Sequence, residues 1–501
     1  MKLRSNVKFR LYQEMLLDKA VKTDLLCVLP TGTGKTLIGL GLSLLKIKDG
    51  KILFLTPTKP LCEQHKNTFE EFLIDYEEED LCVYNGSITP KKRIELWEKG
   101  KIIFATGETV ENDLIIGRID LNDVSLIIFD EAHRGVGDYA YTFIAKTYLK
   151  CKRKEKKFLG LTASPGSDIE KIKEIMRNLN LKEIEIIEET DEIIRTHVKK
   201  KKIKPVFISL SEEHKKIKKF LENSLKNQLL LLKNCSLIES IDQRKINKRT
   251  LLLAQKKALE LIKEGENFYS ELSTISACIK ILHSKNVFLT QGAESLLEYY
   301  KNLLKNKKTK ANKTIVENMD YKNAISLVNN KKIKNPKIEA LMKILKENLR
   351  KTSKAIIFTD YRKTTEVLKK ELIKNEFSAE IFIGQRNGMS QKEQKKVLEK
   401  FKKNEFQILV CTSIGEEGIH IPSIDIGIFY EPIPSALRNI QRRGRVGRTN
   451  IGKIFVLIMK NTVDEAYYWV SKYKERNMRR AIKELKEKND NKQKLLKEFF
   501  N

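Results

Sequence analysis

The first third of the chain alternates short apolar runs with longer segments of mixed character. Five runs of four or five residues are mostly aliphatic or aromatic and end near small or turn-forming residues: 25–29, 52–55, 101–105, 126–129 and 158–161. Such runs, separated by helix-length segments, are typical of parallel strands covered on both faces. The pattern predicts an α/β domain built on a doubly wound parallel sheet.

A second set of similar runs appears late in the chain, at 355–358, 379–383, 407–411, 425–430 and 454–458. The stretch between the two sets is different: after Pro205 the next proline is Pro336, and Leu, Ile, Lys and Glu recur at helical spacing. We therefore expect two five-strand α/β domains, at 1–204 and 334–480, with an all-helical insert at 205–333. A basic tail at 481–501 would follow. The lysine run 305–313 is either a solvated helix face or a binding surface.

Composition indicates a class of partner. Lys and Arg number 97 against 66 Asp and Glu, a formal net charge of +31. That surplus makes a polyanion the expected partner, with nucleic acid ahead of an anionic membrane. The chain contains neither a signal-peptide pattern nor an apolar run of membrane-spanning length. Its seven cysteines show no paired spacing. We expect a cytoplasmic protein without membrane partners, and neither a disulfide nor a zinc scaffold.

A glycine-containing turn, PTGTGKT at 30–36, follows the first predicted strand and precedes a predicted helix. In that context backbone N–H groups and the positive helix end can surround the phosphates of ATP. Lys35 would reach the β- and γ-phosphates, and the Thr36 hydroxyl would hold Mg²⁺. The strict phosphate-loop pattern has glycine where Leu29 stands, and the alternative is a glycine-rich turn without a ligand. The residues expected to line the ATP site are Thr31, Gly32, Thr33, Gly34, Lys35 and Thr36.

Two adjacent carboxylates, in the sequence DEAH at 130–133, follow the apolar run 126–129. They would stand at the carboxyl end of a parallel strand, where ligands bind in such sheets. Asp130 can hold hydrated Mg²⁺, and Glu131 can orient and deprotonate the attacking water. The alternative is an acidic helix cap.

An arginine-rich turn, QRRGRVGR at 441–448, lies in the second predicted domain. Arginines there could reach across a cleft to the γ-phosphate, or could instead contact nucleic acid.

PTGTGKT, DEAH, TASP at 162–165 and QRRGRVGR, in this order, resemble the motifs of DEAH-type superfamily-2 helicases. Longer stretches are similar to the archaeal Hef helicases, relatives of the Fanconi anaemia M-type translocases. These stretches are DEAHRGVGDYAYTFIA at 130–145, FTDYR at 358–362, CTSIGEEG at 411–418, FYEPIPSALRNIQRRGRVGR at 429–448 and DEAYYW at 464–469. The resemblance implies two RecA-like domains with a helical insert, and an ATP- and Mg²⁺-dependent helicase or translocase acting on branched DNA.

Two alternatives stay open at this point. One is a double-stranded RNA helicase of the Dicer or RNA-sensor type, which shares the position of the insert and similar motifs. The other is a nucleotide-gated clamp that does not step along nucleic acid.

The resemblance also assigns roles to individual residues. Arg10 and Gln13 fall on the adenine side of ATP. His133, Thr162 and Ser164 would couple the state of ATP to domain closure. Gln441, Arg445 and Arg448 match the γ-phosphate side. The positions that match nucleic-acid contacts are Thr58, Lys59 and Thr106 in the first domain and Thr359, Arg362, Gln385 and Thr412 in the second.

Three features depart from the family pattern. Gly107 stands where many relatives have proline, which would loosen a strand contact. His420 stands where relatives often carry an aspartate that holds the ribose, which leaves ribose selectivity open. The ERKxxxD signature of the nuclease that Hef proteins commonly carry does not occur in this sequence.

The last residues, KQKLLKEFFN, contain the pattern Q-x-x-L-x-x-F-F at Gln493, Leu496, Phe499 and Phe500. One helical turn would place Leu496 and the two aromatic rings on one side as an apolar plug, a form of peptide that binds a replication sliding clamp. The alternative is that both phenylalanines pack onto the second domain as ordinary core.

Overall fold

The structure is a computed structural model of the whole chain. It describes residues 1–166, 169–188, 191–195, 202–306, 308–330, 333–350, 352–384, 388–412, 424–432 and 453–500; within these ranges the side chains of 192, 195, 202, 391, 482 and 485–500 are outside the description.

The first domain is built on seven parallel strands in the order β5-β6-β3-β7-β8-β2-β9. The strands are β2 (Leu25–Val28), β3 (Lys51–Thr56), β5 (Leu81–Tyr84), β6 (Ile102–Thr106), β7 (Val124–Asp130), β8 (Lys157–Thr162) and β9 (Glu183–Ile186). All seven residues of β7 are buried, as expected for a central strand covered on both faces.

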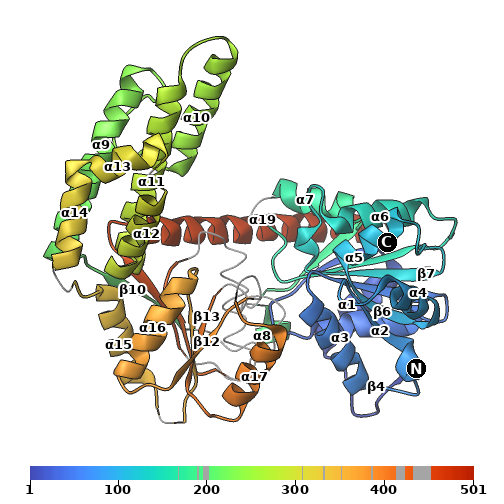
Figure 1. Cartoon of the computed structure of the whole chain (residues 1–501). Helices are drawn as coiled ribbons and strands as arrows, with labels where there is room; N and C mark the ends of the chain where they lie inside the picture. Colours follow the sequence, from blue (N-terminus) through green and yellow to red (C-terminus); the bar gives the residue numbers. More distant parts are fainter. Residues whose placement is uncertain are drawn as a thin grey trace.

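Helices cover both faces of this sheet (Figure 1). The helices are α1 (Leu11–Lys22), α2 (Lys35–Lys46), α3 (Lys59–Phe72), α4 (Pro90–Lys99), α5 (Gly107–Ile115), α6 (Ala140–Lys150), α7 (Ile169–Asn178) and α8 (Glu192–Arg195). Two separate apolar cores result, one beneath α1, α2 and α3 and the other beneath α4 to α7. Smaller elements are the antiparallel pair β1 (Lys2–Leu3) and β4 (Leu73–Ile74) and the single-turn helices η1 (Glu78–Asp80) and η2 (Ala132–Arg134).

The second domain contains a six-stranded parallel sheet in the order β10-β15-β14-β11-β13-β12. Its strands are β10 (Lys202–Ile208), β11 (Ala355–Phe358), β12 (Ala379–Phe382), β13 (Ile408–Cys411), β14 (Ile426–Phe429) and β15 (Lys453–Met459). The described helices of this domain include α15 (Pro336–Asn348), α16 (Arg362–Lys374) and α17 (Gln391–Lys402).

The insert is a helical bundle that projects from the second domain (Figure 1). It consists of α9 (Glu212–Asn234), α10 (Lys248–Lys263), α11 (Tyr269–Gln291), α12 (Ala293–Lys305), α13 (Lys310–Glu317) and α14 (Met319–Asn330). A core of its own, separate from those of the sheets, holds the bundle together.

The expected fold class is therefore confirmed: two parallel-sheet domains with a helical domain between them. The expectation of five strands in each sheet was wrong, since the described residues form seven strands in the first sheet and six in the second. The extra strands β5, β9 and β10 lie at sheet edges. An edge strand is covered less completely, so its sequence can carry charged residues, as EIEI does in β9.

The boundary expected between residues 204 and 205 falls inside β10, which pairs along its whole length with β15 of the second sheet. Pro205 therefore lies within a strand rather than at the start of the insert. Proline is tolerated there because β10 is the edge strand of its sheet, and one side of its backbone needs no ladder partner.

A long helix, α19 (Val463–Phe500), follows the last strand of the second domain and runs across to the first (Figure 1). Its Met478 belongs to the apolar core beneath α7. The separate tail expected from residue 481 onward is thus the continuation of this helix. Among the residues that the structure describes, no helix has the length and apolarity needed to cross a membrane.

Candidate nucleotide site and nucleic-acid interface

The phosphate loop joins β2 to α2. Gly34 precedes α2 with a left-handed backbone, φ +77° and ψ +37°, a conformation that suits glycine better than other residues. A Cβ atom at Gly34 would lie 2.5 Å from Gln13 Nε2. Glycine at this position allows Lys35 and Thr36 to begin the helix, with N–H groups that have no intrahelical partner and can face an anion.

Two side chains of α1 hold this loop. The Tyr12 hydroxyl and Gln13 Nε2 both donate to the carbonyl oxygen of Thr33, over 2.7 and 3.0 Å. Gln13 Oε1 accepts from the backbone N–H of Arg10 over 2.8 Å. The Nε2 end of Gln13 thus supports the loop and its Oε1 end supports the start of α1. The adenine contact expected of Arg10 and Gln13 stays a prediction.

The remaining loop residues differ in burial. Thr33 is buried, and its hydroxyl donates to the carbonyl of Pro30 over 2.7 Å. Thr31 and Lys35 are half-buried, and Gly32 is exposed at the tip with φ +82°. The loop is held from inside by its own threonine while its outer edge is open to a ligand.

The acidic pair stands at the carboxyl end of β7. Asp130 is buried, and its carbonyl accepts from the Tyr141 hydroxyl over 3.0 Å. Glu131 has a left-handed backbone with φ +51° and ψ +48°, which is uncommon for a residue with a Cβ and is found at functional sites. The turn directs the two carboxylates differently: the Glu131 side chain keeps 20% of its surface exposed and that of Asp130 only 9%.

His65 of α3 lies between the loop and the acidic pair, a position that the sequence did not reveal. Its Nε2 is 2.9 Å from Asp130 Oδ2, and its Nδ1 is 3.3 Å from Thr36 Oγ1. An ionised carboxylate only accepts, so Nε2 donates to it, and in a neutral ring Nδ1 would accept from the threonine hydroxyl. A lone histidine in α3 carries no sequence signal of this role.

Thr36 and Asp130 fit the expected Mg²⁺ site. When the Thr36 hydroxyl donates to the neutral imidazole of His65, its oxygen lone pairs are available for a cation. Oxygen ligands suit Mg²⁺, which usually keeps waters and shares one or two carboxylates with substrate phosphates. No group of three or more His, Cys, Asp or Glu side chains that could hold a metal occurs in the described part of the chain. Thr36 and Asp130 supply two oxygen donors, which agrees with a cation that also binds the phosphates of a nucleotide.

A row of close polar contacts connects the acidic pair to the TASP motif. His133 Nδ1 lies 3.3 Å from Glu131 Oε2 and 3.1 Å from the Thr162 hydroxyl. The Thr162 hydroxyl donates to the carbonyl of Ser164 over 3.1 Å and accepts from the Ser164 N–H over 3.2 Å. The three expected coupling residues therefore form a chain of contacts, and the first of them, His133, contacts Glu131, the proposed base.

The three expected nucleic-acid contacts of the first domain gather around one hollow of about 310 Å³. The hydroxyl of Thr58, at the start of α3, is buried and has no hydrogen-bond partner among the described residues. Thr106 Oγ1 lies 2.8 Å from Thr109 Oγ1. A buried hydroxyl without a partner is costly, and a phosphate oxygen would satisfy it. The hollow is lined by Pro57, Thr58, Lys59, Gly86, Thr106, Glu108, Thr109 and Asn112.

Close packing accounts for Gly107 next to this hollow. A Cβ atom at Gly107 would lie 3.0 Å from the ring of Tyr141, and the hydroxyl of that ring supports the Asp130 carbonyl. A larger residue at 107 would displace this ring. The loosened strand contact expected of Gly107 stays a prediction.

In the second domain the expected contacts Thr359, Arg362 and Thr412 lie beyond the carboxyl ends of the sheet strands. Thr359 and Thr412 follow the adjacent parallel strands β11 and β13 and are buried. Arg362 Nη2 donates to the carbonyl of Gly384 over 3.1 Å, which ties α16 to the end of β12. Gln385, Gln441, Arg445, Arg448 and His420 lie outside the described residues, so their roles stay predictions. The same holds for the side chains of Gln493, Leu496, Phe499 and Phe500.

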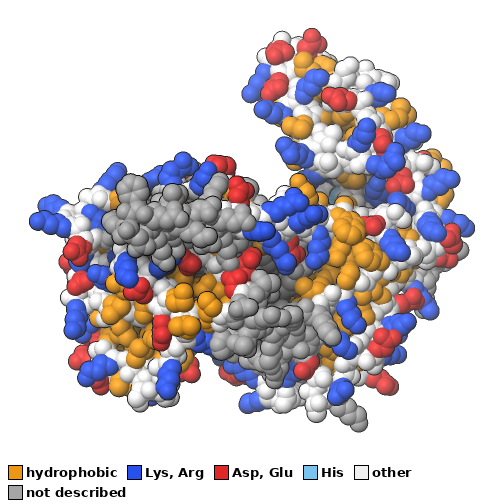
Figure 2. Space-filling view, turned by 180° about the vertical axis from the view of Figure 1, so that it is seen from behind, with side chains coloured by type: hydrophobic (Ala, Val, Ile, Leu, Met, Phe, Trp, Pro, Cys, Tyr) orange, Lys and Arg blue, Asp and Glu red, His pale blue; other side chains and the backbone are white. Residues whose placement is uncertain are grey.

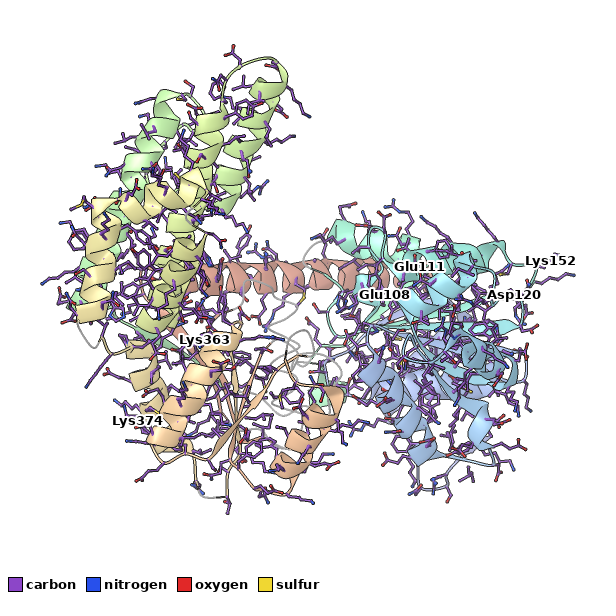
Figure 3. The ribbon with its side chains drawn as sticks, in the orientation of Figure 1. Glu108, Glu111, Asp120, Lys152, Lys363 and Lys374 are labelled. Atoms are coloured by element: carbon purple, nitrogen blue, oxygen red, sulfur yellow. The ribbon has the colours of Figure 1, made fainter. Side chains whose placement is uncertain are left out.

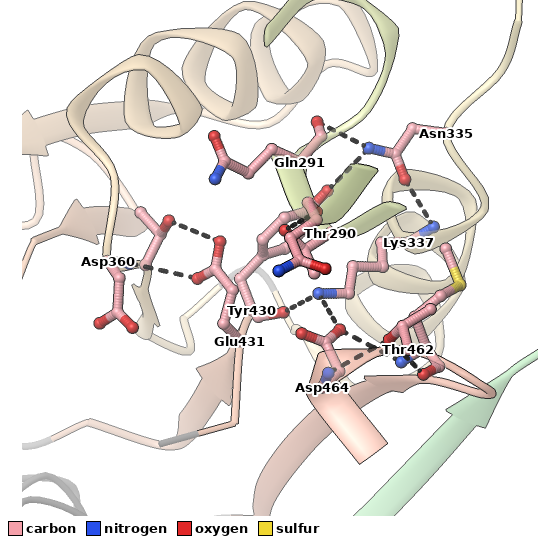
Figure 4. Close-up of polar contacts among 12 residues, drawn as sticks. Thr290, Gln291, Asn335, Lys337, Asp360, Tyr430, Glu431, Thr462 and Asp464 are labelled. Carbon is pink, nitrogen blue, oxygen red and sulfur yellow. Dashed lines mark hydrogen bonds and ion pairs between the residues drawn. The ribbon is translucent and has the colours of Figure 1, made fainter. Parts of the chain in front are cut away.

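A buried polar cluster near the ends of β11 and β14 was also not expected (Figure 4). Glu431, at the end of β14, accepts from the Thr359 hydroxyl and the Asp360 N–H. Lys337 pairs with Asp464 in the same region. The FYEP and DEAYYW stretches in the sequence contain two of these residues, but nothing local indicates that they meet.

The surface charge is spread rather than concentrated. On the face shown in Figure 2, Lys and Arg side chains are distributed over the insert and both sheet domains. Figure 3 shows Lys363 of α16 on the side of the second domain nearest the insert, with Lys374 at the opposite end of the helix. Lys363 Nζ lies 3.8 Å from Glu298 Oε2 of α12, which connects the insert to the helix that begins with Arg362.

Three family descriptions match consecutive parts of the chain. They are "Type III restriction enzyme, res subunit" over 6–167, "Putative ATP-dependent RNA helicase, helical bundle" over 213–335, and "Helicase conserved C-terminal domain" over 336–450. Two parallel-sheet domains with a bundle between them and a phosphate loop before α2 define the class of superfamily-2 helicases.

The crystal structure of the Pyrococcus furiosus Hef helicase domain matches with a TM-score of 0.73 and 41% identity, over 92% of this chain and 98% of that one. A putative ATP-dependent RNA helicase of Methanocaldococcus jannaschii is 42% identical over 95% of this chain and 61% of its own length. ATP-dependent DNA helicase mph1 of Sclerotinia sclerotiorum is 30% identical over 91% of this chain and 40% of its own. The chain belongs to the Hef/FANCM-like helicases and spans about half the length of these two relatives.

Proposed function

We propose that the chain is an ATP-dependent helicase or translocase that acts on branched DNA, such as replication forks and junctions, in the cytoplasm. The observation that carries the proposal is two groups of side-chain contacts that meet at the adjacent residues Asp130 and Glu131 of the nucleotide site. Thr36, His65 and Asp130 are linked on one side, and Glu131, His133 and Thr162 on the other. A protein that only bound nucleotide would not need a base linked to the TASP motif.

In the proposed mechanism Lys35 and the loop N–H groups bind the phosphates of ATP. Mg²⁺, held by Thr36 and Asp130, would neutralise phosphate charge when bound. Glu131 takes the proton of the attacking water, and its exposed edge gives that water access. Gln441, Arg445 and Arg448 would complete the site from the second domain.

Movement would come from alternating grip. The Thr58 hydroxyl and Thr106 of the first domain and Thr359, Arg362 and Thr412 of the second would hold the backbone of one strand. Closing the domains on ATP would bring the two grips together, and hydrolysis would release them. Because the contacts are to backbone phosphates, binding should depend strongly on salt and weakly on sequence.

Double-stranded RNA is the rival substrate, since one relative and one matching family carry RNA helicase in their names. An ATPase panel with forked DNA, Holliday junction, linear duplex DNA and duplex RNA of equal length separates the two. We expect the largest stimulation with fork or junction. Stronger stimulation by duplex RNA would assign RNA as the substrate. ATP-dependent binding without strand displacement would instead favour a nucleotide-gated clamp that does not step along nucleic acid.

We also propose that the C-terminal peptide containing Gln493, Leu496, Phe499 and Phe500 binds a sliding clamp. The support is the four-position pattern in the sequence, together with the helical backbone of α19 through Phe500. A clamp would raise the local concentration of the enzyme at forks. Changing both phenylalanines to alanine should abolish clamp binding in calorimetry and leave the melting temperature unchanged. A fall of several degrees would instead assign both rings to the core.

A further inference from the structure

Although positive charge is spread over much of the surface, one hollow of the first domain gathers it. This basic hollow has a volume of about 390 Å³ and thirteen described lining residues. Seven of them are Lys or Arg, three are Asp or Glu, and only Val21 is apolar. The formal excess is thus four positive charges. Sites for small organic molecules are mostly apolar, so this lining fits an anion instead.

The basic hollow lies where strands of the first sheet begin. Lys157 is the first residue of β8, and Asp24 and Lys182 immediately precede β2 and β9. β8 ends at Thr162 of the TASP motif, so the hollow and the nucleotide site lie at opposite ends of one strand, about 17 Å apart at the usual rise of a strand. Figure 3 shows Lys152, in the loop that leads into β8, at the outer end of the first domain, away from the second domain. The basic hollow is therefore separate from the nucleotide cleft.

Three of the seven cations already have anionic partners. Lys22 and Lys46 stand in the last turns of α1 and α2, where cations also stabilise the helix end. Each has a carboxylate oxygen no more than 3.0 Å away. Lys182 Nζ lies 3.2 Å from Asp24 Oδ2. These three lysines need no further anion.

The loop between α6 and β8 supplies cations whose charge is not cancelled. Arg153 Nε and Nη2 donate to the carbonyls of Glu155 and Asp49. Lys156 Nζ donates to the carbonyl of Arg153 over 2.7 Å, and Lys154 is exposed. Carbonyl oxygens orient these side chains but leave their charges in place. None of the three cations forms an ion pair within the described part of the chain.

Lys157 lies deeper in the basic hollow, with a side chain only 12% exposed. Its Nζ donates to the carbonyl of Val21 over 3.1 Å and lies 4.0 Å from Asp24 Oδ1. The same carboxylate is closer to Lys182. Burial lowers the pKa of Lys157; Asp24 opposes this shift, while Lys46 and Lys182 add to it. A largely buried ammonium that shares one distant carboxylate is stabilised by an added anion.

The chemistry of the basic hollow favours a chain of phosphates over other anionic partners. Its four available cations come from one segment, 153–157, and range from exposed Lys154 to largely buried Lys157. A nucleic-acid backbone that runs past this segment presents one phosphate after another to such a row. An anionic membrane fits less well, because binding at a lipid surface also needs apolar side chains to insert, and Val21 alone is apolar here.

We propose that the basic hollow binds phosphates in a second duplex arm of a branched substrate, while the tracked strand is held at the other end of the first sheet. The inference rests on the proposed function, which places Thr58 and Thr106 on the tracked strand. Thr106 ends β6 and Thr58 follows β3, so a segment of backbone held there does not also fill the hollow. A branched substrate offers a second segment that a linear strand lacks.

The length of the arm is the sharpest test. A span of about 17 Å corresponds to about 5 base pairs at about 3.4 Å each. Fluorescence anisotropy would compare labelled forks that share one junction and differ in one arm, of about 20 or about 4 base pairs, with each arm shortened in turn. We expect the whole chain to bind the long-armed fork about tenfold more tightly, the order of two exposed contacts between a cation and a phosphate.

A charge-reversal variant connects this effect to the loop. Lys154→Glu combined with Lys156→Glu should bind both forks with the affinity that wild type shows for the short-armed one. The combination Lys154→Gln and Lys156→Gln should lie between the two. Neither lysine forms an ion pair in the described chain, so the melting temperature should not change. Affinity for a single strand of about ten nucleotides, which occupies only the tracked-strand contacts, should also be unchanged.

A matched control makes the same change of charge in the second domain. Lys402→Glu combined with Lys403→Glu alters two exposed lysines at the end of α17 and should keep the wild-type dependence on arm length. An equal loss in both charge-reversal variants would overturn the site, since the charges would then act only at a distance. Calorimetry with tripolyphosphate, with ADP in excess to fill the nucleotide site, tests a free polyanion. Binding that only the Lys154 and Lys156 variant loses, with arm-length dependence retained, would assign a free polyphosphate and overturn the arm.

The outcomes separate this inference from the proposed function. A wild type that binds neither strand nor fork would contradict both. A wild type whose ATPase the fork stimulates, but whose affinity is independent of the length of either arm, would keep the proposed function and overturn the second-arm site alone. Arm-length dependence that persists in the charge-reversal variant would overturn it equally. If that variant does not fold, the glutamine variant is judged by the same criterion.

Discussion

The Ser164 hydroxyl donates to Met478 Sδ over 2.9 Å, joining residues 314 positions apart in the chain. Ser164 belongs to the TASP motif of the first domain. Met478 lies on α19, whose beginning is fixed to the second domain by the buried Asp464. A single helix is thus anchored in both domains, and one of its anchors is a proposed coupling residue.

This hydrogen bond leads to a prediction about Met478. Met478→Ala should lower the free energy of unfolding by about 2 to 3 kcal/mol, as expected when a nearly buried methionine is truncated, and should reduce the ratio of nucleic-acid-stimulated to unstimulated ATPase. Urea unfolding and steady-state ATPase measure the two effects. Met478→Leu keeps the volume without the thioether and should cost under about 1.5 kcal/mol. An unchanged stimulation ratio in Met478→Ala would mean that the helix has no part in coupling.

The second prediction separates ATP binding from hydrolysis. Lys35→Ala should abolish turnover because the phosphates lose their cation. Glu131→Gln should keep ATP binding but stall hydrolysis, with nucleic acid held tightly. Stopped-flow binding of a fluorescent ATP analogue and phosphate release distinguish the two variants. Near-normal phosphate release in Glu131→Gln would exclude this residue as the base.

The third prediction concerns His65, which contacts both proposed Mg²⁺ ligands. Without the imidazole, Thr36 and Asp130 lose the partner that orients them. His65→Ala should raise the Mg²⁺ concentration needed for half-maximal nucleotide binding by about tenfold or more, the usual effect of removing an outer partner of metal ligands. His65→Gln, which can still donate to the carboxylate, should lie between alanine and wild type. Equal Mg²⁺ dependence in all three proteins would reduce His65 to a packing residue.

The fourth prediction concerns the lysine run of the insert. Deleting the whole insert from residue 206 would cut β10, so substitution is the cleaner test. Changing four exposed lysines to glutamine should reduce the preference for forked over linear DNA. It should also flatten the slope of log affinity against log salt by about 0.9 for each phosphate that the variant leaves unneutralised. The four are Lys305, Lys308, Lys310 and Lys313.

A matched control removes the same charge from the second domain. It changes four exposed lysines on or just after α17 to glutamine, namely Lys392, Lys395, Lys396 and Lys403. If both quadruple variants bind more weakly to the same extent and keep the fork preference, the insert lysines form a solvated face.

The strands that carry the nucleotide site could be predicted from the sequence. β2 and β7 are buried on both faces, so their residues form uninterrupted apolar runs that need no knowledge of their neighbours. The phosphate loop and the acidic pair are contiguous motifs at the ends of these strands. Their geometry follows from local backbone conformations, such as the left-handed turns at Gly34 and Glu131.

The edges of the sheets were decided by tertiary structure. β10, with the sequence KIKPVFI, has charged residues and a proline among its apolar ones, and its own residues would also suit a loop. It becomes a strand because β15 offers it seven paired positions. That partner is separated from it by the whole insert and most of the second domain.

Side-chain partnerships were likewise invisible in the sequence. His65 lies 65 positions from Asp130, and Thr359 lies 72 positions from Glu431. The apolar and polar pattern of each element predicts its helix or strand without reference to the distant partner residue. Which face of α3 turns toward β7, and which end of β14 meets the turn after β11, depends on how the helices pack across the sheets. Charge burial at Glu431 depends on the same packing, because its pKa is raised chiefly by the elements that exclude water from it.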